Sequence, residues 1–322
     1  MREKRQSSGR TETVKGGREI KKKYFLVFEG SKTEEIYFQA IEDHYGRSGK
    51  NMIMELVMLI RHNSEEGFSN PKKMVEMILR SLKEHKEKNY SYRSVIDWIS
   101  GYINENNIIN NKKEKVIAQE LEEICRRGHK KKPEDSIDEK ELQNVINELL
   151  KTYFKEISEK IGQQFRDSVT MKKLVADIIT QNELTYYEDL DQIVMIVDRD
   201  KHSFLQNQYD EVKKACEDNG FRLCVTNPCF EFWLFLHFKA RFDKKKMLKN
   251  EVDSSGDTYC YNKLREVFAG YTKSSFKPDR LMKNVPNAIK RAEEYTTDLI
   301  KLKKEIGSNV GELLKEMGIT SQ

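Results

Sequence analysis

The chain alternates short apolar runs of strand type with amphipathic helical segments, and this alternation limits its fold more than any other feature. Strand-type runs occupy residues 24–28, 52–60, 192–197 and 222–225, and a helical pattern follows each run. A helix between two strands favours parallel pairing with a right-handed crossover. The sequence therefore predicts an α/β fold built on an open, doubly wound, Rossmann-like parallel sheet.

A long segment without strand-like runs interrupts this alternation. Residues 90–190 are rich in Lys and Glu and contain amphipathic patterns near 114–127, 138–157 and 171–182. We expect an all-helical insertion module at 90–190, within a discontinuous α/β domain made of 23–89 and 191–320. Residues 1–22 have few apolar positions and several Gly and Ser, so they are expected to be a disordered basic tail.

Composition and cysteine usage indicate a cytoplasmic protein with no membrane partner. The chain contains no apolar run long enough to span a bilayer, and its polar N-terminus lacks the core of a signal peptide. Its five cysteines are scattered and form no CxxC pair. This argues against a disulfide framework or structural zinc, and for a reducing compartment.

The charge distribution offers two candidate arms for nucleic-acid binding. The net charge of +5 is small, and solvated mixed-charge surfaces are the commoner explanation. However, residues 1–23 contain nine Lys or Arg against three Glu, and a second basic run lies mid-chain. In that run the residues expected to contact phosphate are Arg126, Arg127, Lys130, Lys131 and Lys132.

Three carboxylates follow the predicted strands and form the candidate catalytic site. Glu29 comes directly after the first strand, and Asp198 and Asp200 follow the third. Ligands of open parallel sheets bind outside the carboxyl ends of the strands, so these residues are expected at one edge. Asp198 and Asp200 are two apart, which places them on the same side of an extended segment. Their repulsion would require a divalent cation, and Mg²⁺ or Mn²⁺ prefers such oxygen ligands.

The structural alternative is that these residues only cap helices or tighten turns. An Asp-x-Asp after a strand is common and weak by itself, and the paired Glu-Gly after the first strand strengthens it. Lys32 could approach a phosphate beside Glu29, or it could be an ordinary exposed loop lysine.

The sequence resembles the RloB-like family of the Toprim superfamily. The resemblance lies in FLVFEGSKTEEIYF at 25–38, IVDRDKH at 196–202, TNPCFEFWLFLHF at 226–238 and SNVGEL at 308–313. It covers roughly residues 20–85 and 190–318, whereas 90–190 match nothing in the family.

This resemblance implies a Toprim-like fold, with Glu29 as general acid/base and Asp198 and Asp200 as metal ligands. Glu29 also counts among the metal-site carboxylates. The family is associated with bacterial anti-phage defence, usually as presumed nucleases. Besides nucleic acid, the resemblance suggests other defence proteins or a nucleotide activator as partners.

The predicted helix after Asn227-Pro228 carries two further candidates. His237 shares the core-facing stripe with Phe230, Trp233 and Leu234, so we interpret it as a buried, hydrogen-bonded side chain. Glu231 lies off that stripe in the first turn and is a candidate fourth carboxylate of the metal site.

Two alternatives to a metal-dependent nuclease acting on DNA or RNA, transfer RNA included, remain open. The first is a nucleic-acid or nucleotide sensor whose Toprim-like site does not hydrolyse. The second is a metal-free ribonuclease of HEPN type, because Arg80 and His85 match the spacing R-x4-H. Activity that survives EDTA would indicate the second.

Overall fold

The structure is a computed structural model. It describes residues 2–3, 22–28, 32–46, 55–60, 71–109, 112–157, 168–184, 186–200 and 204–319, with only the backbone at 2–3, 55–60 and 168. Of the expected disordered tail, only Arg2–Glu3, which forms the short strand β1, and Lys22 fall within this range. The rest of residues 1–22 lies outside the described residues, as do Glu29, Gly30 and Ser31.

The chain divides into two compact units. One, here called the sheet unit, comprises residues 10–59, 69–75 and 187–322. The other, the helical unit, comprises residues 76–186 with the short segments 1–9 and 60–68. Helix α2 (Pro71–Glu87) runs from the first unit into the second. Independent folding of an insertion at 90–190 stays a prediction.

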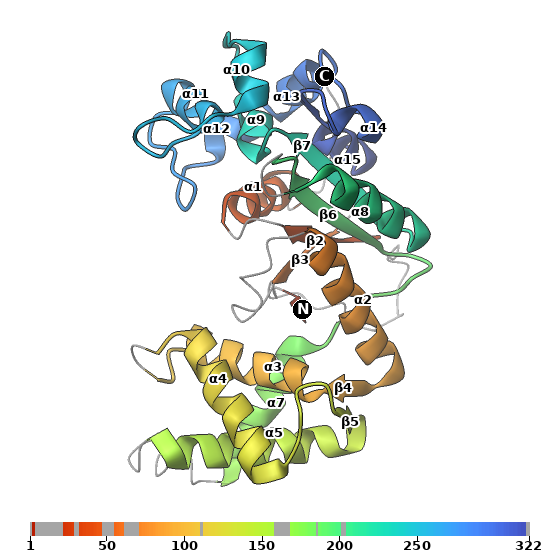
Figure 1. Ribbon diagram of the computed structural model, residues 1–322, viewed down its shortest axis with the longest axis vertical. Helices are drawn as coiled ribbons and strands as arrows, with labels where there is room; N and C mark the ends of the chain where they lie inside the picture. The colour runs from red at the N-terminus through yellow and green to blue at the C-terminus, as the bar shows by residue number, and fades with distance from the viewer. Residues whose placement is uncertain are drawn as a thin grey trace. The chain divides into compact units, whose positions relative to one another are not determined.

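Parallel strands form the centre of the sheet unit (Figure 1). Its strands follow the order β3-β2-β6-β7-β8. Parallel pairing joins β3 (Glu55–Ile60), β2 (Lys23–Phe28), β6 (Gln192–Asp198) and β7 (Arg222–Asn227). The short β8 (Gly307–Ser308) closes the β7 edge in the antiparallel direction. The predicted parallel sheet is therefore confirmed.

Helices cover both faces of this sheet. Successive side chains of each strand point to opposite sides, and because β2 and β6 are apolar along most of their length, both faces must be buried. On one face, Phe28 stacks on Phe38 of α1 (Thr33–Ile41), with ring centroids 5.6 Å apart. On the other face, Cys216 of α8 (Gln206–Asp218) contacts Met195 of β6. Such two-sided burial explains why the strands read as continuous apolar runs.

Short helices complete the sheet unit, and most of them pack on the face that α1 covers. They are α9 (Phe230–Phe235), α10 (Lys244–Lys249), α11 (Tyr259–Val267), α12 (Asp279–Met282), α13 (Val285–Ala292), α14 (Leu299–Leu302) and α15 (Val310–Glu316).

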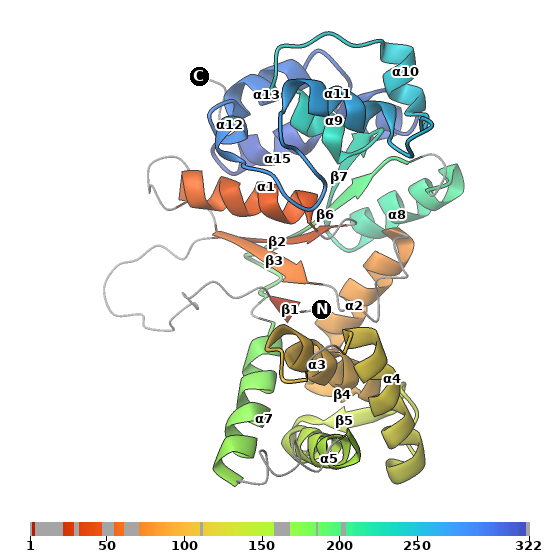
Figure 2. The same ribbon diagram turned by 90° about the vertical axis from the view of Figure 1, so that its left-hand side faces the viewer.

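The helical unit has an apolar core of its own and is not purely helical. Its helices are α3 (Tyr92–Glu105), α4 (Glu114–Ile124), α5 (Glu139–Ile157) and α7 (Ser168–Asn182). Beside α5 lies an antiparallel pair formed by β4 (Asn89–Ser91) and β5 (Ser136–Asp138) (Figure 2). The expectation of an all-helical insertion is therefore wrong. Strands of three residues are too short to show an alternating pattern.

Two helices of the sheet unit start without a capping side chain at their own N-cap. Asn227 is the last residue of β7, and Cys229 is the N-cap of α9. The N-cap of α1 is Lys32, whose side chain makes no capping hydrogen bond. In the part of the chain that the structure describes, no helix has the length and apolar character needed to cross a bilayer.

Candidate functional site

The carboxyl ends of β2, β6 and β7 meet at one edge of the sheet. Phe28 at the end of β2 pairs with Ile196, and Asp198 at the end of β6 pairs with Thr226. Because all three strands run in the same direction, the residues that follow them start from the same edge. Glu29, which follows Phe28, lies outside the described residues, so its place at this edge stays a prediction.

Asp198 connects the end of β6 to the start of α9. One of its carboxylate oxygens, Oδ1, accepts a hydrogen bond of 2.7 Å from the backbone N–H of Phe230. Cys229, the N-cap residue, supplies no side-chain acceptor to this helix. Asp198 therefore performs the capping that a local residue usually provides, and the same bond fixes the orientation of its carboxylate.

Arg199 separates Asp198 from Asp200 and is a structural side chain. Its guanidinium donates to the carbonyl oxygens of Phe204 at 2.6 Å and Lys303 at 3.1 Å. It also lies over the ring of Tyr209. Burial lowers the pKa of the Arg199 guanidinium. Asp200 is half-buried, and its backbone carbonyl accepts from the N–H of Phe204.

Glu231 is almost fully buried, 4% exposed, and faces a lysine from a distant loop. Its Oε1 lies 3.4 Å from Nζ of Lys273 and accepts a 3.4 Å hydrogen bond from the hydroxyl of Tyr271. The side chain of Lys273 is 64% exposed. The negative charge of Glu231 is the main cause of a raised pKa at Lys273, and Asp198 raises it further. The ammonium of Lys273 is thus within electrostatic reach of both carboxylates.

The loop that carries Lys273 is also tied to the start of α1. The hydroxyl of Thr33 donates a 2.7 Å hydrogen bond to the carbonyl oxygen of Lys273. Thr33 follows closely on the segment that contains Glu29. Lys273 was not predictable from the sequence, because it lies in a polar loop with no periodic pattern, 42 residues after Glu231 in the chain.

The oxygen atoms at this edge suit a hard divalent cation, although the described residues alone do not complete a site. The side-chain amide of Asn227 donates to the carbonyl of Leu302 at 2.8 Å, so its orientation is fixed. Its Oδ1 is buried and has no hydrogen-bond partner among the described residues. Carboxylate and amide oxygens are ligands that Mg²⁺ and Mn²⁺ accept. No three acidic, His or Cys side chains within the described ranges gather closely enough to hold a metal ion.

His237 is a buried structural residue, as predicted. Its Nε2 lies 3.1 Å from the hydroxyl of Tyr37, and its Nδ1 lies 3.1 Å from the carbonyl oxygen of Trp233. Burial lowers the pKa of His237 to about 3, so the ring is neutral near pH 7. A neutral imidazole that donates from Nδ1 and accepts at Nε2 satisfies both contacts.

The geometry around His85 does not favour the metal-free ribonuclease. Its Nδ1 lies 2.7 Å from the carbonyl oxygen of Ser81, and its Nε2 lies 2.8 Å from that of Asn182. Both ring nitrogens thus face backbone acceptors, which joins the end of α2 to the end of α7. Neither nitrogen is turned toward solvent as a general base would be.

The predicted phosphate-binding residues lie in different units. Arg126 forms a two-pronged contact with Glu123, and Arg127 contacts Glu123 and Glu156, all in the helical unit. Their charges are therefore matched locally. Lys130, Lys131 and Lys132 are exposed, and so is Lys32 of the sheet unit, whose Nζ lies 3.9 Å from Glu35.

Comparison with known proteins gives one match. A family model described as RloB-like protein matches residues 150–317, slightly more than half of the chain. The match includes Asp198, Asp200 and Glu231 but not the segment around Glu29. It also includes residues 150–189, which we had expected to lie outside the resemblance. No curated protein and no solved structure matches the chain.

Proposed function

The chain belongs to the RloB-like family, and we propose that it is a Mg²⁺- or Mn²⁺-dependent nuclease that cleaves phosphodiester bonds in nucleic acid. The observation that carries the proposal is the meeting of Asp198, Glu231 and Lys273 at the carboxyl edge of the sheet. A buried and a half-buried carboxylate beside an exposed lysine suit a phosphate diester, which needs charge neutralisation and an oriented nucleophile. A role in anti-phage defence is part of the proposal and rests on the family resemblance.

In this proposal Asp198 and Asp200 hold the metal, and Glu29 acts as general acid/base. The bound metal would orient a water molecule and stabilise negative charge on the phosphate. Asp198 is oriented for such a role because the N–H of Phe230 holds one of its oxygens. Lys273 compensates the buried charge of Glu231, and its side chain is exposed enough for a phosphate oxygen to approach it.

The test separates the charge of Asp198 from its capping role. Asp198→Asn keeps an oxygen that can accept from Phe230, whereas Asp198→Ala removes both the charge and the acceptor. We expect Asp198→Asn to lose cleavage and Mn²⁺ binding while its melting temperature stays close to that of the parent. Asp198→Ala should also be destabilised by about 0.5–2 kcal/mol, the usual effect of losing a helix cap.

Purified protein should be incubated with plasmid, single-stranded DNA and total RNA, with and without Mn²⁺, and Mn²⁺ binding should be measured by calorimetry. Glu29→Gln should retain Mn²⁺ binding but lose most of the rate, since acid/base catalysis typically contributes ~10²–10⁴-fold. Full activity in Asp198→Asn would contradict the proposal and leave Asp198 as a structural cap.

A second candidate function is a nucleic-acid-binding sensor that does not hydrolyse its ligand. It is favoured by one observation, namely that the Lys273 ammonium neutralises the charge of Glu231. This candidate predicts nucleic-acid binding with no turnover on any substrate in Mg²⁺ or Mn²⁺. It also predicts that Glu29→Gln binds nucleic acid as well as the parent does.

A further inference from the structure

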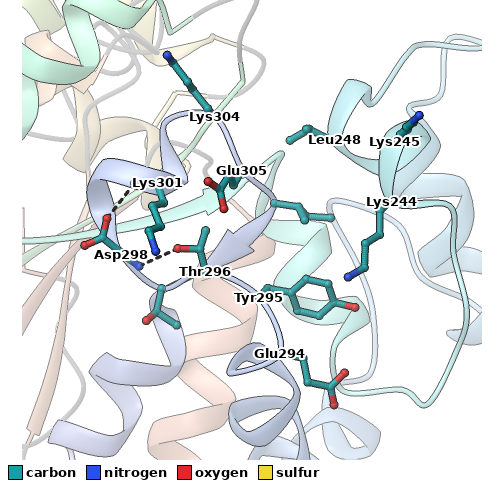
Figure 3. A pocket seen from close by; sticks show the side chains of 12 residues that line it. Lys244, Lys245, Leu248, Glu294, Tyr295, Thr296, Asp298, Lys301, Lys304 and Glu305 are labelled. Carbon is teal, nitrogen blue, oxygen red and sulfur yellow. Dashed lines mark hydrogen bonds between the residues drawn. The ribbon is translucent and has the colours of Figure 1, made fainter.

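A cavity with lysines on two walls lies in the sheet unit, apart from the residues that sequence analysis selected for phosphate binding. Its volume is about 690 Å³. Lys244 and Lys245 of α10 form one wall, and Lys301 and Lys304 form the opposite wall (Figure 3). Tyr295 lies between them, and Nζ of Lys244 is 5.1 Å from the centre of its ring. We call these five residues the lysine groove.

The charge around the lysine groove favours an anionic ligand. Its lining also includes Glu294, Asp298 and Glu305, so the four lysines exceed the acidic residues by one. The neighbouring chain adds more positive charge, because residues 239–249 contain four further Lys or Arg besides Lys244 and Lys245, and one Asp. Lys244, Lys245, Lys301 and Lys304 are exposed and form no ion pair with any described residue. Four lysines without carboxylate partners are a natural contact for phosphates.

The size and lining of the cavity favour a single strand over a duplex. A volume of this order accommodates a ligand of one or two nucleotides, whereas a duplex presents a convex cylinder that cannot enter it. Tyr295, Leu248 and Ile306 add aromatic and apolar surface between the lysines. Lysines that follow a backbone, next to an aromatic ring, are the usual components of a single-strand site.

The wall of the groove is bonded directly to the carboxylate edge. The carbonyl of Leu302 accepts from Asn227 at the end of β7, and that of Lys303 accepts from Arg199, which follows Asp198. Leu302 and Lys303 lie between the groove lysines Lys301 and Lys304. A strand that lies along this wall is therefore next to the strand ends that carry the candidate site.

We propose that the lysine groove binds the phosphate backbone of a single-stranded nucleic acid, next to the bond that the carboxylate edge cleaves. This inference rests on the proposed nuclease function, to which it adds the substrate class. A base that stacks on Tyr295 would take the place that the Lys244 side chain holds over the ring.

Binding without cleavage tests the groove. The full chain is titrated into fluorescein-labelled single-stranded DNA and RNA in EDTA, and anisotropy is followed over a range of salt concentrations. Changing Lys244, Lys245, Lys301 and Lys304 to Gln should weaken binding on the order of tenfold or more. The slope of the logarithm of the binding constant against the logarithm of the salt concentration should also become shallower by up to about 3. Each lost phosphate contact contributes ~0.7 to this slope for single strands.

A charge-matched control uses lysines outside the groove. Lys213 and Lys214 of α8 are paired with Glu217 and Asp218, and their change to Gln removes two charges. This variant should bind like the parent, while Lys301→Gln/Lys304→Gln, with the same net charge, should bind more weakly. Equal affinities for these two double variants would overturn the groove assignment.

Two further arms identify the ligand. A duplex of the same sequence should bind more weakly than the single strand, and equal or tighter duplex binding would contradict the assignment. A mononucleotide triphosphate that displaces the strand at micromolar concentration would make the groove a nucleotide site instead. Failure of the groove and failure of the nuclease proposal remain distinguishable. If only the groove assignment fails, cleavage still depends on Asp198. If the nuclease proposal fails, Asp198→Asn retains full cleavage.

Discussion

At the scale of single residues, polar side chains of the sheet unit hold backbone groups that the helices and strands leave unsatisfied. Asp198 accepts from the first N–H of α9. Asn309 accepts from the N–H of Val225 at 2.6 Å and donates to the carbonyl of Leu223 at 3.0 Å. The Asn309 amide thus imitates a neighbouring strand beside β7. Each such group would cost about 1–3 kcal/mol if it were buried and unpaired, so these side chains are structural whatever else they do.

His237 gives a pH dependence of stability that can be measured. Its pKa is lowered to about 3 by burial, from an ordinary value of 6.5. Between these values the unfolded chain binds a proton that the folded chain does not, so stability is complete above pH 6.5 and falls as the pH decreases. The slope is about 1.4 kcal/mol per pH unit, or about 2 kcal/mol between pH 6.5 and 5. Urea unfolding at these pH values measures it.

The control for this prediction is His237→Gln, which removes the titrating ring. Its unfolding free energy at neutral pH should be lower, because the contact with Tyr37 changes. Its dependence on pH between 6.5 and 5 should be flatter than that of the parent. Parallel curves for the two proteins would mean that His237 is protonated in the folded state.

At the scale of elements, the first residue of β8, Gly307, allows two chain segments to approach closely. Gly307 pairs with Asn227 of β7 and also bridges to Thr296. A Cβ atom at Gly307 would lie 1.9 Å from the carbonyl oxygen of Thr296, so only glycine fits without a backbone shift. Thr296 also lines the cavity of the lysine groove. The glycine therefore positions the floor of the groove against the sheet.

We expect Gly307→Ala to destabilise the protein by at least about 2 kcal/mol, because the backbone must move to relieve the overlap. Gly311→Ala is the matched control. A Cβ atom there would lie 3.5 Å from the Trp233 ring, an ordinary contact, and Gly311 is in helix α15. That change should be neutral or stabilising by up to about 1 kcal/mol. Thermal unfolding of both variants checks the pair, and a neutral Gly307→Ala would contradict the close approach.

The elements that were predictable from sequence are those with a strong local signal. The buried runs of β2 and β6 lie within a residue of their predicted bounds, 24–28 and 192–197. Gly220, with a φ of 66°, follows α8 as a C-terminal glycine should. These features depend on neighbours in the chain, so periodicity and capping residues identify them.

Elements set by distant contacts were not predictable. Helices α13 and α14 are separate, because Thr296 pairs with Gly307 and Asp298 starts a new helix. The strands β4 and β5 depend on each other across almost 50 residues. In the candidate site, Asp198 was identified from its position after a strand, and Glu231 from its position in the first turn of the next helix. Lys273 was not, because only the folded loop brings it to Glu231.

At the scale of the whole molecule, the chain has two apolar cores. The core of the helical unit extends from Tyr90 to Ile178, and that of the sheet unit is built around β2, β6, β7 and α9. Within the helical unit, Nε2 of His85, which is near the start of the unit, is hydrogen-bonded to the carbonyl oxygen of Asn182, which is near its end. A unit whose ends lie close together can be inserted into another without disturbing it. The sheet unit resumes soon after the helical unit ends, and there Asp191 accepts a hydrogen bond from the backbone N–H of Lys23.

We therefore expect the two units to unfold separately, and the two tryptophans of the chain can report this. Trp98 is buried in the helical unit and Trp233 in the sheet unit. Single-tryptophan proteins made by Trp98→Phe or Trp233→Phe should each report one urea transition. Leu149→Ala, in the core of the helical unit, should cost about 2–5 kcal/mol. It should lower only the midpoint that Trp98 reports.

Leu234→Ala is the matched change in the sheet unit, since both leucines are fully buried. It should lower only the midpoint that Trp233 reports, because each cavity weakens the core that surrounds it. If either substitution lowers both midpoints equally, the chain unfolds as one cooperative whole. The helical unit would then be part of a single folding domain and could not be replaced by a linker. A shift confined to one probe in each variant would instead establish two folding units in one chain.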